Sequence, residues 1–349
     1  MRRTTAALFA VIFLLAACNG ADTDDPAGDP TPAAEATLEG EAEELVVYSG
    51  RSEELVGPVF AAFEEATGIT LSVRYGDTAE MAAQILEEGD NSPADVYFGQ
   101  DAGALGALEN ANRFVTLPED LISGVPSQFR SVNSQWTGVT GRSRVAVYNP
   151  DRVNEEELPD SILEFTDERW RDRLGWAPTN GSFQAFVTGL RELEGEERAR
   201  EWLTQMQALG TRVYANNGAI VQATSAGEID AGFVNHYYAY QIAKREPGLR
   251  AANHFFTGGD PGALVNVAGV GILRSSDAQA TAGRLVEYLL SEDAQNHFAT
   301  ESSEYPMIDG IAIDERLTPL DELQPPDIDL SDLEDLEGTL ALLREVGLL

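Results

Sequence analysis

The 349-residue sequence has very little cysteine, histidine and basic charge. Its single cysteine, Cys18, leaves no partner with which the chain could form a disulfide. Its three histidines, His236, His254 and His297, form no pair at helical spacing and no cluster with cysteine, which argues against a zinc site. The chain also lacks a G-x-S-x-G nucleophile elbow, a P-loop and a dinucleotide-binding glycine motif after a strand. We therefore expect a protein that binds a ligand and catalyses nothing.

The charge balance narrows the classes of partner. Only 23 basic residues stand against 59 acidic ones, for a formal net charge of -36. Nucleic-acid binding needs basic patches, so we expect no nucleic-acid partner, and an anionic membrane surface would repel the chain. A solvated acidic surface is compatible with attracting cations. Carboxylate pairs are too frequent for any one to be chosen as an acid–base couple, so a secreted hydrolase remains only as an alternative.

The N-terminus predicts export and attachment to a lipid. Arg2 and Arg3 precede the apolar run 6–17, which ends in Leu15-Ala16-Ala17-Cys18. This placement of Cys18 resembles a bacterial lipobox, and the resemblance implies removal of residues 1–17 and lipidation of Cys18. The alternative is an ordinary signal peptide that contains a cysteine. No later hydrophobic run is long enough for a transmembrane helix, and the acidic segment 18–43 is predicted to be a disordered tether.

From residue 44 onward, helical and strand patterns alternate. Strands are predicted at 44–48, 69–75 and 94–98, and helices at 53–67 and 78–88, which indicates a parallel, doubly wound sheet. The strands at 141–148 and 263–272 are interpreted as crossings between two lobes. The segment 160–164 is predicted to begin the first helix of the second lobe, and further elements are predicted at 196–208, 213–214, 219–225, 229–234, 278–290, 292–300 and 333–346. Accordingly, residues 44–141 and 269–318 are assigned to the first lobe, and residues 142–268 and 319–349 to the second.

Two adjacent tyrosines follow the predicted buried strand 229–234. Tyr237 and Tyr238 lie where this strand ends and a helix begins, and ligands of open α/β sheets bind at the carboxyl ends of strands. Ionised phenols are hard oxygen donors. Because the pKa of a phenol is about 10, two tyrosines ionise at neutral pH only when a strong positive charge lies beside them. Ferric iron is the common biological ion that phenolate favours. The alternative is that the pair is ordinary half-buried packing.

A second candidate site lies at Asn180-Gly181-Ser182, which follows a predicted strand end and opens a helical segment. Backbone amides at a helix N-terminus can bind an anion, although the same residues can simply cap the helix. Asn217 and Asn235 occupy similar edges between strand and helix.

The chain resembles the ferric-iron-binding, substrate-binding proteins of bacterial ABC importers, also called bacterial transferrins. The resemblance extends from Val46 to the C-terminus and is carried by short segments in a specific order. These are Ser92-Pro93-Ala94-Asp95-Val96, Gly141-Arg142-Ser143-Arg144-Val145, Pro178-Thr179-Asn180-Gly181, Asn216-Asn217, Gly227-Glu228-Ile229-Asp230, Asn235-His236-Tyr237-Tyr238, Asp260-Pro261-Gly262-Ala263-Leu264 and Glu304-Tyr305-Pro306.

The resemblance implies a type II periplasmic-binding-protein fold, in which two α/β lobes joined by two crossover strands close on Fe³⁺. Each lobe would hold a mixed, mostly parallel sheet flanked by helices. Tyr237 and Tyr238 match the paired tyrosinate ligands of the family. Positions that hold a synergistic phosphate in one subgroup match Asn180, Gly181, Ser182, Asn217 and Asn235. Arg142 and Arg144 match a pair near the cleft that faces a carbonate or balances charge, or else has a structural role.

The chain departs from the family at three ligand positions. Ser52 stands in place of a histidine, Gln100 in place of a glutamate, and Phe183 in place of a third tyrosine. Glu53 and Asp101 are the neighbouring acidic residues that would have to substitute. Two phenolates with an anion and water would make an open site, and a chelated ferric species would also fill the vacant positions.

These features lead to one expected function and one alternative. We expect a monomeric receptor, anchored by lipid on the outer face of the cytoplasmic membrane. It would capture Fe³⁺ with phosphate or carbonate and deliver it to the permease and ATPase subunits of an ABC importer. The alternative is a binding protein for an organic cation such as thiamine or a polyamine, which the acidic and aromatic residues would also suit.

Overall fold

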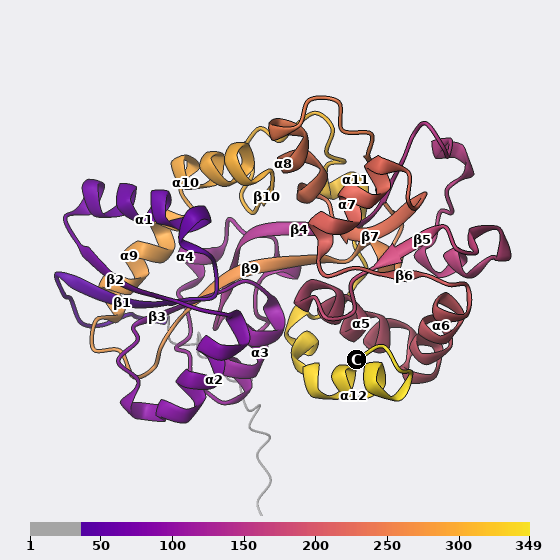
Figure 1. Ribbon diagram of the computed structural model, residues 1–349. Coiled ribbons are helices and arrows are strands. Elements are labelled where there is room, and N and C mark those ends of the chain that lie inside the picture. Colours follow the sequence, from indigo (N-terminus) through magenta and orange to yellow (C-terminus); the bar gives the residue numbers. More distant parts are fainter. Residues whose placement is uncertain (1–35) are drawn as a thin grey trace, which may run out of the picture. The chain divides into compact units, whose positions relative to one another are not determined.

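Ten strands form one mixed sheet in the computed structural model, which describes residues 36–349. The strand order is β2-β1-β3-β9-β4-β7-β5-β6, and two short strands, β8 (Ala252–His254) and β10 (Tyr305–Pro306), pair with β4 (Figure 1). Cys18, the predicted signal peptide and most of the predicted tether lie outside the described residues.

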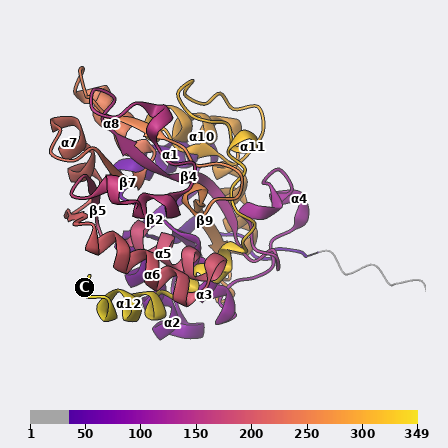
Figure 2. The same ribbon diagram turned by 90° about the vertical axis from the view of Figure 1, so that its right-hand side faces the viewer.

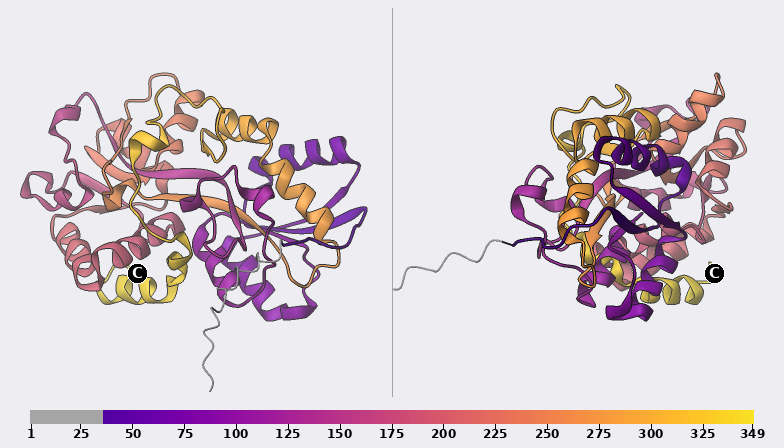
Figure 3. Two further views of the ribbon diagram at one scale, coloured as in Figure 1. Left: turned by 180° about the vertical axis from the view of Figure 1, so that it is seen from behind. Right: turned by 90° about the vertical axis from the view of Figure 1, so that its left-hand side faces the viewer.

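The first lobe is the part of the sheet formed by β1 (Glu44–Ser49), β2 (Thr70–Tyr75) and β3 (Val96–Gly99), with its helices. The three strands are parallel. Helices α1 (Glu53–Thr67), α9 (Gln279–Leu289) and α10 (Glu292–His297) lie on one side of it, and α2 (Thr78–Glu88) and α3 (Ala102–Asn110) on the other (Figure 3). The short helix α4 (Glu119–Ile122) follows α3 in the chain. Helix α1 has the predicted bounds because its apolar residues recur at helical spacing, and Gly68 ends it with φ of 75°.

The second lobe is built in the same way on β5 (Leu174–Trp176), β6 (Arg212–Val213) and β7 (Ala231–Asn235), which are also parallel. Helices α5 (Gly181–Glu194) and α6 (Glu196–Ala208) lie on one side of these strands, and α7 (Asn217–Ala226) and α8 (Tyr237–Arg245) on the other (Figure 2).

The predicted helix at 160–164 is wrong. Two 3₁₀ turns lie there instead, Ile162–Thr166 and Glu168–Trp170, because Ser161 and Asp167 each cap a single turn.

Two long strands run through both lobes, β4 (Thr137–Tyr148) and β9 (Val265–Ile272). They pair with each other antiparallel, and β9 continues onto β3 while β4 continues onto β7. Every residue of both strands is buried. The fold is therefore the expected two-lobe α/β structure, joined by two crossover strands.

The C-terminal segment touches both lobes. It contains α11 (Leu320–Leu323), a 3₁₀ turn at Leu330–Glu334 and α12 (Leu336–Glu345). The 3₁₀ turn packs on α3, where Gly103 and Gly106 allow the backbone of Leu333 and Ser331 to approach closely. Helix α12 packs on α5 of the second lobe, where the hydroxyls of Thr188 and Thr339 lie 2.8 Å apart.

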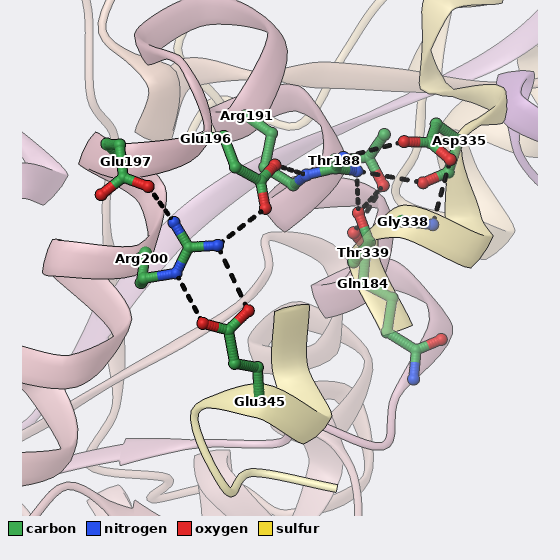
Figure 4. A network of polar contacts seen from close by, with 10 residues as sticks. All are labelled: Gln184, Thr188, Arg191, Glu196, Glu197, Arg200, Asp335, Gly338, Thr339 and Glu345. Carbon is green, nitrogen blue, oxygen red and sulfur yellow. Dashed lines mark hydrogen bonds and ion pairs between the residues drawn. The ribbon is translucent and has the colours of Figure 1, made fainter. Parts of the chain in front are cut away.

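Arginine side chains fasten α12 to the second lobe (Figure 4). Arg191 of α5 donates to Asp335 at 2.8 Å, to the hydroxyl of Thr339 at 3.0 Å and to Glu196 at 2.6 Å. Arg200 of α6 donates to Glu345 at 3.1 Å. The side chain of Arg191 is only 11 % exposed and that of Arg200 is 27 % exposed, so the contacts of Arg191 are the less screened by water.

The folded domain begins earlier than the predicted tether ends. The backbone N–H of Ala42 donates to Thr281 at 2.9 Å, and the carbonyls of Glu39 and Gly40 accept from Ala280 at the start of α9. These bonds satisfy backbone groups at the helix N-terminus. Residues 39–42 therefore lie against the first lobe. Within residues 36–349, no helix is both long and apolar enough to cross a membrane.

Candidate functional site

The tyrosine pair stands at the head of α8, and the residue before it fixes this end of the helix to β4. The ring of His236 is fully buried. Its Nδ1 accepts from the backbone N–H of Ser143 at 3.1 Å, so Nε2 carries the hydrogen and donates to the carbonyl of Ser303 at 2.7 Å. Burial lowers the pKa of His236 to about 4, so the ring is neutral at physiological pH. Both ring nitrogens are occupied, and His236 is a support of the site.

The rings of Tyr237 and Tyr238 are stacked, with centroids 4.5 Å apart and planes inclined by 28°. Both residues are half-buried and line the same cleft. Burial raises the pKa of Tyr237 above its ordinary value, and Tyr238 raises it further, whereas the guanidinium of Arg142 lowers it. The Tyr237 phenol therefore keeps its proton unless a cation binds beside it.

The cleft has a volume of about 570 Å³ and lies between the lobes. The first lobe contributes residues of α2 and α3 and the ends of β1 and β3, and the second contributes the start of α5 and the tyrosine pair. Leu333, Glu334 and Leu336 of the C-terminal segment also line it. Its polar lining residues include Asp77, Gln100, Asp101, Arg142, Thr179, Asn180, Ser182, Gln184, Tyr237 and Tyr238.

The structure brings together the predicted anion-binding residues at the head of α5. The Oδ1 atom of Asn180 accepts from the backbone N–H of Ser182 at 3.2 Å and from its hydroxyl at 2.5 Å, which makes Asn180 the N-cap of the helix. Asn217, at the head of α7, donates to Asn180 at 3.3 Å and to the Ser182 hydroxyl at 3.2 Å. Gly181 is exposed beside them, with open space where a side chain would be.

Two buried arginines lie behind this group. Arg142 and Arg144 are each 3 % exposed, and neither forms an ion pair within the described residues. Arg144 donates to the carbonyl of Phe233 at 3.1 Å and lies 3.4 Å from both Ser182 Oγ and Asn235 Oδ1. Burial lowers the pKa of Arg144 to about 9 and also lowers the pKa of Arg142.

Several donors in this group have no partner. The Nη1 of Arg142, the Nε of Arg144 and the Nδ2 of Asn235 are buried without a hydrogen-bond partner in the part of the chain that the structure describes. An unpaired buried donor costs about 1–3 kcal/mol, more when charged. Of these residues only Arg142 lines the cleft, whereas Arg144 and Asn235 line a small separate cavity that Arg142 and Ser182 also line. An anion bound at this edge would balance the guanidinium charges.

The other predicted cleft residues are placed unequally. Gln100 and Asp101 line the cleft, although one carboxylate oxygen of Asp101 accepts from Ala104 and caps α3 at 3.1 Å. Ser52 and Glu53 are exposed on the first turn of α1 and do not line the cleft. Phe183 is fully buried, with its ring 5.7 Å from that of Trp176, so its side chain packs in the core of the second lobe.

Sequence reasoning missed a buried ion pair beside the tyrosines. Arg51 and Glu304, each 2 % exposed, form two parallel bonds of 2.9 and 2.7 Å. Glu304 raises the pKa of Arg51 despite burial, and the two tyrosines act in the same direction. Arg51 lies in the loop before α1 and Glu304 in the segment Glu304-Tyr305-Pro306 that carries part of the resemblance, but neither segment indicates that the two residues pair.

The usual clusters of carboxylate and histidine ligands do not occur in the described residues, so a metal ion in this cleft would need other oxygen donors. Residues 36–349 contain no group of three or more His, Cys, Asp or Glu side chains that could hold a metal ion. The stacked tyrosines are thus the strongest candidate ligands there.

Comparison with known proteins gives a consistent result. Residues 89–331 match the family of bacterial extracellular solute-binding proteins. The major ferric iron-binding protein of Neisseria meningitidis is 34% identical over 313 residues, which cover 87% of this chain and 93% of that protein. The crystal structure of iron-bound HitA from Pseudomonas aeruginosa is 36% identical and has a TM-score of 0.80 over 87% of this chain and 99% of that one. A Trichodesmium protein in complex with iron and citrate is 25% identical, with a TM-score of 0.77 over 88% of this chain and 100% of that one.

Proposed function

Since this chain belongs to the bacterial extracellular solute-binding proteins, with ferric-iron-binding proteins among its relatives, we propose that it captures Fe³⁺ in the cleft between its lobes. Tyr237 and Tyr238 bind the ion as phenolates. The anion that completes the site, phosphate or carbonate in the simplest case, binds to the group around Asn180, Ser182 and Arg142.

The observation that carries the proposal is the stacked tyrosine pair at the head of α8. Two phenols side by side in a half-buried place repel each other when ionised, so only a highly charged cation makes their ionised form favourable. The neighbouring guanidinium of Arg142 works in the same direction because it lowers the pKa of Tyr237.

The test is an absorbance titration of the mature domain with ferric citrate. Ferric tyrosinate should produce a visible charge-transfer band that grows to one iron per protein. A Tyr237→Phe/Tyr238→Phe variant should show no band, and a Tyr240→Phe variant is the matched control because Tyr240 donates instead to the carbonyl of Arg316 at 2.9 Å. A band of equal strength in the double variant would show that the ligands lie elsewhere.

The family and the sequence of the N-terminus support a proposal for the route of delivery. We propose that the protein is exported, is attached to the membrane through lipid on Cys18, acts as a monomer and delivers iron to the permease and ATPase subunits of an ABC importer. Metabolic labelling with a fatty acid should mark the wild type and leave Cys18→Ser unlabelled.

The two buried arginines argue against an organic cation as the ligand. Arg142 and Arg144 lie unpaired behind the tyrosines and would repel a positively charged group there. A thermal-shift screen should accordingly show a large rise in melting temperature with ferric iron and none with thiamine or spermidine.

A further inference from the structure

We propose that the small cavity behind the cleft binds a monatomic anion, chloride under ordinary conditions, between Arg142, Arg144 and Asn235. This second anion site is separate from the cleft in which iron and its anion are proposed to bind. Its role is to balance the charge of two arginines that the fold buries where β4 pairs with β9 and β7.

The register of the strands brings the polar side chains of this cavity together. Arg142 and Arg144 are two positions apart on β4, so their side chains point to the same face of the sheet. Asn266 of β9 lies opposite Arg142, and Asn235 of β7 lies opposite Arg144, in antiparallel pairs. Directly opposite residues of such pairs share a face. Two guanidinium groups and two amides therefore gather on one face, where Ser182 in the first turn of α5 also lines the cavity.

The cavity offers more hydrogen-bond donors than acceptors. Arg142 Nη1, Arg144 Nε and Asn235 Nδ2 are buried without a partner in the described residues. The contact of 3.4 Å from Arg144 Nη1 to Asn235 Oδ1 orients the amide, so that its Nδ2 hydrogens are the free ones. The side-chain oxygen of Asn266 already accepts from two backbone N–H groups, at 3.0 and 2.8 Å. The unpaired groups thus need an acceptor that the lining residues do not supply.

The charge beside the cavity is positive. Neither Arg142 nor Arg144 forms an ion pair with a carboxylate of the described residues. The nearby carboxylates are engaged elsewhere, because Glu304 pairs with Arg51 at 2.7 Å and Asp101 caps α3. The N-terminus of the 14-residue helix α5 adds further positive potential. An occupant with negative charge is therefore favoured over a neutral one.

Aromatic rings stabilise the buried charge of Arg144 only in part. The rings of Phe183 and Phe186 each lie 5.5 Å from the central carbon of its guanidinium, and such contacts favour a cation. They help to explain how this charge is kept in the core of the second lobe. They do not supply the strong acceptor that the Nε of Arg144 lacks.

The size of the cavity selects the class of anion. Its volume of about 10 Å³ is close to the space that one water-sized particle occupies. Phosphate, carbonate and carboxylates have several heavy atoms and do not fit, whereas chloride is a single atom that accepts N–H bonds from several directions. A water molecule would also fit, but its hydrogens would face donors, and Ser182 Oγ already accepts from Asn217 at 3.2 Å.

The first experiment measures the effect of chloride on the iron-free mature domain. Thermal unfolding is followed in sodium chloride and in sodium gluconate at the same ionic strength, without phosphate or bicarbonate. Chloride should raise the melting temperature in a saturable way, by about 1–3 °C, because it binds the folded state. A melting temperature equal in the two salts would overturn the chloride site. Because no iron is added, the result does not depend on the proposed function.

A substitution in the cavity tests where the anion lies. In Asn235→Asp a carboxylate replaces the amide beside Arg144, so this variant should melt above the wild type in gluconate and gain nothing from chloride. Asn154→Asp is the matched control, because Asn154 is exposed, does not line the cavity and caps a 3₁₀ turn that aspartate caps equally well. It should keep the full response to chloride. An equal response in Asn235→Asp would place the anion elsewhere and overturn the assignment.

Crystallography in bromide locates the anion directly. Bromide replaces chloride and is identified by its anomalous scattering. Crystals of the mature domain in sodium bromide, with and without phosphate, should both show an anomalous peak at hydrogen-bonding distance from Arg144 Nε and Asn235 Nδ2. An ordered water without anomalous signal at that place would overturn the proposal. A peak that phosphate removes would show that cavity and cleft share one anion, and would overturn the second site.

Discussion

At the scale of single residues, the site depends on groups whose ionisation is set by burial. The buried arginines and histidine and the half-buried tyrosines lie within one region, around the middle of β4 and the carboxyl end of β7. Each exists in the charge state that its surroundings favour, so pH is the most direct experimental variable.

Iron affinity should rise with pH. Burial raises the pKa of Tyr237, so the free protein holds this phenolic proton at neutral pH, and iron must displace it. Each proton released makes the association constant about tenfold larger per pH unit. Titrations between pH 5.5 and 7.5 with a competing chelator of known pH dependence should give a slope of at least one proton for wild type and one proton less for Tyr237→Phe. A slope of zero would mean that the tyrosines bind as neutral phenols or not at all.

His236 should make the domain sensitive to acid. Its pKa is about 4 in the folded protein and 6.5 in an ordinary environment, so below pH 6.5 the unfolded chain binds a proton that the folded protein does not. The free energy of unfolding is therefore not reduced by His236 above pH 6.5. It falls as the pH drops from 6.5 towards 4, by roughly 3 kcal/mol in all.

The measurement is urea unfolding at pH 7.5 and 5.0 with His236→Gln as the comparison. Glutamine can still accept from Ser143 and donate to Ser303 but has no proton to gain. The difference in unfolding free energy between wild type and variant should shrink or reverse at pH 5.0. If that difference stayed constant with pH, titration of His236 would contribute nothing.

At the scale of elements, the 3₁₀ turn at Leu330–Glu334 can pack closely on α3 only because glycines of α3 have no side chain at the contact. A Cβ atom at Gly106 would overlap the carbonyl oxygen of Ser331 and lie 3.0 Å from its Cα. Ser331 also donates to Glu109 of α3 at 3.3 Å, so the turn cannot move away without losing that bond.

Gly106→Ala should therefore destabilise the protein by about 1–3 kcal/mol, although alanine is the better helix former. Gly57→Ala in α1 is the control, because a Cβ there would meet only Glu53 at 3.4 Å and Tyr75 at 3.9 Å. We expect Gly57→Ala to stabilise by up to about 1 kcal/mol, as measured by urea unfolding. If Gly106→Ala were as stable as Gly57→Ala, the turn would not be packed as the structure shows.

The helices were the most predictable elements. Helices α1, α2 and α6 have the bounds expected from the sequence, because in each a single amphipathic pattern ends at, or shortly before, a glycine. The segment at 160–166 was not predictable in this way, since one helical turn with a capping serine looks like the start of a longer helix.

At the scale of the whole molecule, the two-lobe fold and the place of the tyrosine pair followed from the order of strands and helices and from short motifs. Local sequence patterns do not predict which distant segments of the chain come into contact. Arg51 meets Glu304 across 253 positions of the chain, and nothing near either residue indicates the pairing.

Ligand binding should draw the lobes together. The covalent joints at the cleft are β4, β9 and the C-terminal segment, and the tyrosines of the second lobe face α2 and α3 of the first across the cleft. A bound ferric ion with its anion contacts both sides and so binds the closed arrangement more tightly, and the population shifts towards that arrangement in proportion to the difference in affinity. Small-angle X-ray scattering should show a smaller radius of gyration in the presence of ferric citrate.

Two variants separate closure from binding. Tyr237→Phe/Tyr238→Phe should keep the larger radius with and without ferric citrate, because it has no iron ligands. Ala61→Asp should contract as the wild type does, since its charge lies outside the cleft. A wild type that bound iron with its full charge-transfer band but kept its radius would show that the cleft is already in its binding conformation. In that case iron affinity would depend on the tyrosines and the anion alone, and changes on α2 would leave it unaltered.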